Sequence, residues 1–76
     1  MKWKLIERLK LNKPMAHQDL IDLALAANYT PAGRTGSHAK FEKEGVPNLT
    51  IVISKKRDNV LIQYNVIRAL RLAYNV

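Results

Sequence analysis

His38 and Lys40 are the side chains whose types and spacing are best suited to chemistry. They stand two residues apart in His38–Lys43, a segment whose alternation is typical of a β-strand. Residues of one parity share a strand face, and a rise of about 3.3 Å per residue would separate this pair by about 6.6 Å. A phosphodiester fits between them. The imidazole could take a proton from a ribose 2′-hydroxyl while the ammonium group stabilises charge on the phosphate oxygens.

Further cations flank this pair in the sequence. Arg34 precedes the expected turn Thr35–Ser37, and Lys55, Lys56 and Arg57 form a run after the third expected strand. Lys and Arg contacts of this kind hold a nucleic-acid backbone without reading its sequence. The same run is equally typical of a solvated loop, and a lone histidine on a half-exposed strand is often only a solvated polar residue. The residues alone leave both interpretations open.

The remaining candidates for chemistry are few. The chain has no cysteine, which excludes disulfides, thiolate zinc sites and cysteine nucleophiles. His17 falls near the start of an expected helix, where the helix dipole disfavours its protonation, and we assign it no chemistry. Ser37 has the opposite parity from His38 and is expected in the turn. We therefore expect no metal and no cofactor, although carboxylate-bound magnesium stays open from so short a list of residues.

Composition favours a polyanionic partner. The 76 residues include 13 Lys and Arg against 6 Asp and Glu, for a formal net charge of +7. Such a balance points to nucleic acid or to an acidic protein surface. A chain this short forms one domain, residues 1–76, without an enclosed pocket, so any activity is expected on an open surface. The absence of a long apolar run or a signal-like start leads us to expect a cytoplasmic protein.

Apolar spacing predicts helices on both sides of a group of strands. Lys2–Lys10 reads as a short amphipathic helix anchored on the core by Trp3, and Ala16–Ala27 as a second helix. Asn28 is the expected helix stop, because Asn tolerates the left-handed conformation. Gln63–Tyr74 is the expected closing helix.

Between the second and third helices, three strands are expected. Tyr29–Arg34 should be an edge strand because Pro31 lacks a backbone donor, followed by His38–Lys43 and Leu49–Ser54. Alternation assigns Ala39 and Phe41 to the core and leaves His38, Lys40 and Glu42 on the open face. The order α-α-β-β-β-α predicts an α+β fold with helices on one face of a three-stranded antiparallel sheet.

The segment Gly36–His38 and its surroundings resemble the HicA family of small bacterial toxins, and the resemblance covers most of the chain. The end of the second expected helix, Ala27–Tyr29, is similar to a helix end of that family. Gly45–Pro47 matches a turn of one branch, and Tyr64–Val66 is similar to the opening of its last helix. Two positions depart from the family pattern: Ala39 replaces a usual second histidine, and Asn28 replaces a helix-ending glycine.

The resemblance implies a fold similar to the double-stranded-RNA-binding domain and a ribosome-independent mRNA endonuclease in the bacterial cytoplasm. It places the catalytic role on His38. It also implies a HicB-type antitoxin that covers the active face and through which any larger assembly mainly forms. Our leading hypothesis is that this endonuclease cuts RNA without a metal ion. Two alternatives remain from the residues themselves: a module that binds RNA without cutting it, and a basic protein-interaction domain.

Overall fold

The computed structural model describes residues 3–13, 15–53 and 63–76 of the chain. Its elements are, in order, α1 (Trp3–Lys10), α2 (His17–Ala26), β1 (Thr30–Thr35), β2 (His38–Glu42), β3 (Leu49–Val52) and α3 (Tyr64–Tyr74). The expected α+β class and order of elements are confirmed. None of the described helices is long and apolar enough to cross a membrane.

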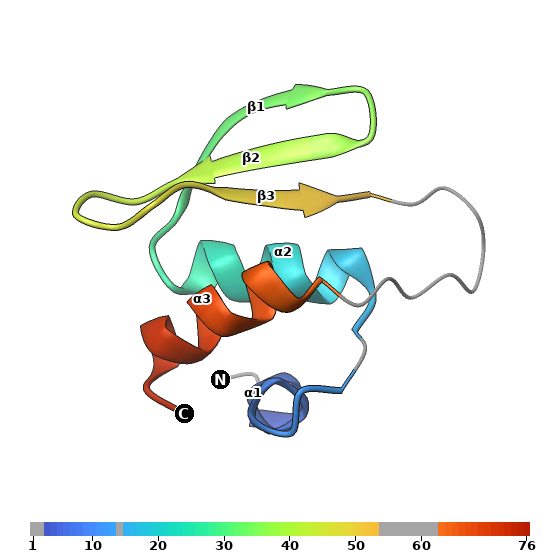
Figure 1. Ribbon diagram of the computed structural model, residues 1–76, viewed down its shortest axis with the longest axis vertical. Helices are drawn as coiled ribbons and strands as arrows, with labels where there is room; N and C mark the ends of the chain where they lie inside the picture. Colours follow the sequence, from blue (N-terminus) through green and yellow to red (C-terminus); the bar gives the residue numbers. More distant parts are fainter. Residues whose placement is uncertain (1–2, 14, 54–62) are drawn as a thin grey trace.

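The three strands form one antiparallel sheet in the order β1-β2-β3, so that β2, which carries His38, lies at its centre (Figure 1). The edge position expected for the strand containing Pro31 is confirmed. The register shifts between Pro31 and Gly33, and Gly33 has a φ of 127°. A glycine fits this irregularity because side-chain-bearing residues rarely adopt that conformation.

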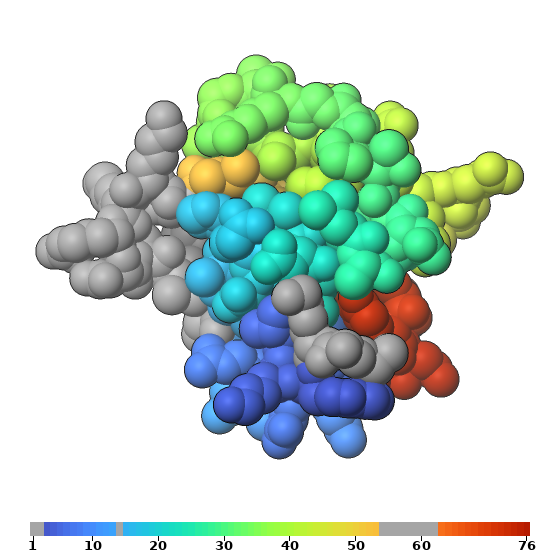
Figure 2. Space-filling view, turned by 180° about the vertical axis from the view of Figure 1, so that it is seen from behind, coloured from blue at the N-terminus to red at the C-terminus, as the bar shows by residue number. Residues whose placement is uncertain are grey.

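The helices form two layers beneath one face of the sheet. α2 and α3 pack against β3, and α1 packs against α2 and α3 on their far side from the sheet (Figure 1). From behind, α2 is visible between the sheet and α1, and the yellow connection between β2 and β3 extends away from the body of the molecule (Figure 2). The opposite face of the sheet carries no described helix.

The hydrophobic core lies between the sheet and α2 and α3 and continues downward to α1. β2 and β3 contribute alternate residues to it, and the helices contribute one stripe each. Its fully buried large side chains are Leu9, Met15, Leu20, Leu23, Ile51, Ile67 and Leu70.

The expected role of Trp3 as a core anchor is wrong. Its side chain is 69% exposed, whereas Ile6 and Leu9 are buried and Leu5 is partly buried against the core. Trp3 is the first residue of α1, one turn before Ile6, and extends beyond the contact that α1 makes with the other helices. The short helix is therefore held by Leu5, Ile6 and Leu9.

Each described helix is followed within two residues by an asparagine with a positive φ: 57° at Asn12, 73° at Asn28 and 59° at Asn75. Beyond Asn28, the Tyr29 N–H donates to the Ala24 carbonyl over 3.0 Å, and the equivalent bonds recur at the other two ends. This pattern defines a Schellman motif, which satisfies carbonyls left free at a helix end. The expected left-handed Asn28 is confirmed, and the same device stops all three helices.

Side chains also join the elements directly. The Tyr74 hydroxyl at the end of α3 donates to the Leu23 carbonyl of α2 over 2.6 Å. Gln63, just before α3, pairs with the outer edge of β3: the Val52 N–H donates to Oε1 over 2.7 Å, and Nε2 donates to the Val52 carbonyl over 3.1 Å. α3 is thus tied both to α2 and to the sheet.

Candidate active site on the open sheet face

His38 follows a tight turn that the fold holds in place. Thr35 pairs with His38 across the two-residue loop Gly36-Ser37. Within this loop only Gly36 has a positive φ, 58°, and this pattern is typical of a type II′ turn. The Ser37 carbonyl accepts a hydrogen bond from the Ile53 N–H over 2.6 Å. The turn is therefore tied to β3, and the first residue of β2 starts from a fixed point.

Strand parity distributes the side chains of β2 as expected. Ala39 and Phe41 are buried, whereas His38, Lys40 and Glu42 are exposed. Burial of the two apolar residues sets the orientation of the others, because slipping the strand by one residue would expose both. The structure thus brings His38 and Lys40 to the same face, about 6.6 Å apart along the strand.

We call the side of the sheet that carries no described helix the open face. On the two outer strands, β1 and β3, the open face is formed by small or β-branched residues. His38 stands opposite Thr35 of β1 and Val52 of β3, and Lys40 opposite Gly33 and Thr50. In these two rows no carboxylate directly faces the imidazole or the ammonium group, so neither is neutralised by a cross-strand ion pair.

Gly33 is a site residue that the sequence reasoning missed. Because it lacks a side chain, the β1 side of Lys40 is open: apart from Gly33 and its two neighbours in the chain, no heavy atom of the described residues lies within 4 Å of where a Cβ would be. A ligand could approach the Lys40 ammonium from that side. A glycine inside an otherwise extended segment is a recognised signal of a bulge or a close approach, and it was available in the sequence.

Arg34 does not join His38 and Lys40 on the open face. Its register partner is Ala39, and directly paired residues of antiparallel strands project to the same side of the sheet. Arg34 therefore starts out toward the helix side, and it is exposed, as is every residue of β1. Its Nε donates to the Gly36 carbonyl over 3.3 Å, which gives Arg34 a role in the turn.

The other expected cations and the second histidine lie elsewhere. Lys55, Lys56 and Arg57 fall outside the described residues. His17 begins α2, in the layer beneath the sheet, and is half-buried. Within residues 3–13, 15–53 and 63–76, no group of three or more His, Asp or Glu side chains is placed to hold a metal ion.

The fold and this face together define a small, basic α+β domain that presents one histidine and one lysine on an uncovered sheet. In comparisons with known proteins, no family model, curated protein or solved structure matches the chain. The functional assignment therefore depends on the residues and their arrangement.

Proposed function

We propose that the protein is the toxin of a toxin–antitoxin module and acts as a metal-independent endoribonuclease on mRNA. The observation that carries this proposal is that His38 and Lys40 are both exposed on the open face, whereas Ala39 and Phe41, which alternate with them along β2, are buried. A flat, uncovered site suits a polymer better than a small metabolite, which is usually enclosed. The net charge of +7 supports a polyanionic substrate.

In the proposed reaction, His38 acts as general base. Its imidazole accepts the proton of a ribose 2′-hydroxyl, and the 2′-oxygen attacks the adjacent phosphorus while the bond to the 5′-oxygen breaks. The imidazolium returns the proton to the leaving 5′-oxygen. The products are a 2′,3′-cyclic phosphate and a 5′-hydroxyl end, and every atom and proton is accounted for without an added reactant.

Lys40 supplies positive charge to the same phosphate. As negative charge builds up on the non-bridging oxygens, an ammonium group one strand repeat away stabilises the transition state more than the starting diester. The open β1 side at Gly33 gives the RNA backbone room to reach Lys40. Thr35 and Thr50 add hydroxyl groups on either side that suit contacts with phosphate or sugar.

The proposal includes a protein partner and a location. A HicB-type antitoxin would neutralise the toxin by covering the open face, and assembly into larger complexes would proceed mainly through that antitoxin. The substrate places the activity in the bacterial cytoplasm. A fold of the double-stranded-RNA-binding-domain type, with its helices behind a three-stranded sheet, belongs to the same proposal.

The deciding experiment compares cleavage of end-labelled mRNA by wild-type protein and His38→Ala in EDTA. Loss of a positioned base should slow cleavage by about 10²- to 10⁴-fold while RNA affinity is largely kept. His17→Ala is the matched control and should cut normally. Equal cleavage by His38→Ala and wild type would overturn the assignment, as would fragments with 3′-hydroxyl ends.

One alternative is supported by the same face: because no carboxylate directly opposes His38, nothing in its cross-strand row orients the imidazole as a catalytic base. The protein would then bind RNA through shape and phosphate contacts without cutting it. A salt-sensitive gel shift by wild-type protein without any fragments would favour this binding module over the nuclease.

A further inference from the structure

A second surface lies between the outer edge of β3 and α3, away from the open face. It is a groove of about 710 Å³. Its lining comes from Tyr29 just before β1, the β2–β3 connection, the first half of β3 and α3: Tyr29, Lys43, Val46, Pro47, Asn48, Leu49, Thr50, Asn65, Val66, Arg68, Ala69, Leu72 and Ala73. His38 and Lys40 do not contribute to it.

The groove is mainly apolar, and two large apolar side chains on it are in contact with solvent. Leu72 is 79% exposed and Val46 is 43% exposed, and they stand on opposite sides, one on α3 and the other on the β2–β3 connection. Leu49 and Val66, which belong to the core, form part of the lining. The groove thus continues the core to the surface at the point where the sheet ends, as sites for protein segments often do.

The edge of β3 above the groove has backbone groups available for pairing. Val52 stands opposite His38, and its N–H and carbonyl point outward, since both bond to Gln63. Backbone direction alternates along an antiparallel strand, so the N–H and carbonyl of Thr50, two residues earlier, also point outward. Among the described residues, only Gln63 pairs with this edge, and it does so at Val52 alone.

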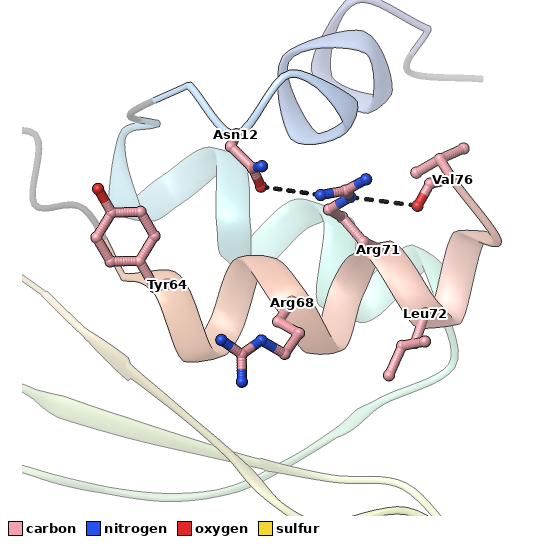
Figure 3. A pocket seen from close by; sticks show the side chains of 6 residues that line it. All are labelled: Asn12, Tyr64, Arg68, Arg71, Leu72 and Val76. Atoms are coloured by element: carbon pink, nitrogen blue, oxygen red, sulfur yellow. Dashed lines mark hydrogen bonds between the residues drawn. The ribbon is translucent and has the colours of Figure 1, made fainter.

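The charges around the groove are positive. Lys43 stands over the ring of Tyr29, with Nζ 5.5 Å from the ring centroid, at one end. Arg68 and Leu72 extend from α3 on the side of the strands, whereas Arg71 extends the other way (Figure 3). Arg71 is already held by Asn12 Oδ1 and the Val76 carbonyl, each at 3.2 Å. No Asp or Glu is among the described residues that line the groove.

We propose that this groove binds an extended acidic peptide segment of a partner protein, which adds to β3 as a fourth strand. The edge at Thr50, which no described residue pairs with, suits an added strand, because β-augmentation satisfies outward backbone groups. Alternate side chains of the added strand would enter the apolar groove beside Leu72 and Val46. Acidic side chains would meet Arg68 and Lys43. The Gln63 amide already occupies the backbone groups of Val52, so the added strand can pair only with the part of β3 before Val52.

This inference does not depend on the nuclease proposal, since the groove excludes His38 and Lys40. The two surfaces share Thr50, whose side chain lies on the open face and whose outward backbone groups would pair with the added strand.

The experiment uses a fluorescein-labelled pool of eight-residue peptides in which every second residue is Glu, Val, Leu, Ile or Phe and the residues between are Thr, so that acidic and apolar side chains share the face that meets the groove. Binding is followed by fluorescence anisotropy. The expected result is saturable binding that Arg68→Glu and Leu72→Lys each weaken at least about tenfold. Both side chains are exposed, so neither substitution should disturb folding, which circular dichroism would verify.

Two controls separate specific strand addition from attraction to a basic protein. Arg8→Glu, on the exposed side of α1, makes the same charge change as Arg68→Glu and should leave binding unchanged. Peptides N-methylated at alternate residues, so that every N–H facing β3 is lost, should not bind. Equal losses with Arg8→Glu and Arg68→Glu, undiminished binding of the N-methylated peptides, or no saturable binding would each overturn the proposal. An RNA oligonucleotide that competes with the peptide on the wild-type protein but not on Leu72→Lys would assign the groove to RNA. That result would also overturn the proposal.

Discussion

The side-chain amide of Gln63 pairs with the backbone of Val52 as a neighbouring strand residue would. The Val52 N–H donates to Oε1 over 2.7 Å, and Nε2 donates to the Val52 carbonyl over 3.1 Å. One side chain therefore replaces one rung of a missing strand. It also fixes the start of α3 beside the sheet. Gln63 binds the outer edge of β3, and His38 of β2 lies on the other edge of the same strand.

Gln63→Leu removes both of these hydrogen bonds at a part-buried position. Leaving the Val52 N–H and carbonyl without their partner should lower the free energy of unfolding by about 1 to 3 kcal/mol. Urea denaturation followed by circular dichroism measures this. Gln18→Leu is the control, because Gln18 makes one exposed bond to Asp22, and its loss should cost at most about 0.5 kcal/mol. Equal costs for the two variants would contradict the bridging role of Gln63.

Lys40→Gln and Arg34→Gln test the distribution of side chains between the two sheet faces. Lys40 shares the open face with His38, so its loss should reduce kcat/KM for RNA cleavage by about 10²-fold, the cost of one transition-state donor. Arg34 starts toward the helix side and bonds to the Gly36 carbonyl, so Arg34→Gln should have a much smaller effect. A larger loss for Arg34→Gln than for Lys40→Gln would refute this assignment of faces.

Tyr74→Phe tests the contact between α3 and α2. Removing the hydroxyl that donates to the Leu23 carbonyl should cost about 1 kcal/mol of unfolding free energy at neutral pH. Burial raises the pKa of Tyr74 above the ordinary 10.0. In the unfolded chain the phenol then loses its proton first, so the stabilisation is complete below about pH 10 and declines as pH rises through the folded-state pKa.

The difference in stability between wild type and Tyr74→Phe should therefore shrink above about pH 10. Urea titrations of both proteins at a series of alkaline pH values measure it, and the comparison cancels the titration of the lysines common to both. A difference that grows with pH would show that the hydroxyl is not buried against Leu23 in the folded protein.

Sequence reasoning was most successful where one local rule decides the outcome. Alternation predicted which side chains of β2 are buried, because a shift by one residue would expose Ala39 and Phe41. Pro31 predicted an edge strand because its missing donor excludes a central position. Asn28 predicted a helix end because few other residues accept a left-handed conformation.

The failures concern relations between segments distant in the chain. Trp3 fits the apolar stripe of its helix, yet only the packing of α1 against α2 and α3 decides how far along the helix that stripe is covered. The role of Arg34 in RNA binding stays a prediction, but the sequence did not show that its register partner is Ala39, which follows from the irregularity between Pro31 and Gly33. Gln63 gave no signal at all, since its pairing with Val52 needs the folded position of α3.

The asparagine ends of α1, α2 and α3 bear on how the chain reaches this fold. Each stop uses hydrogen bonds within its own last turn and the residues directly after it, so helix length is decided locally, and helices form on a timescale of about a microsecond. The contacts of α3 with α1 and with β3 join distant parts of the sequence and must be made later. We expect the docking of α3, completed by Gln63 and Tyr74, to limit the rate of folding.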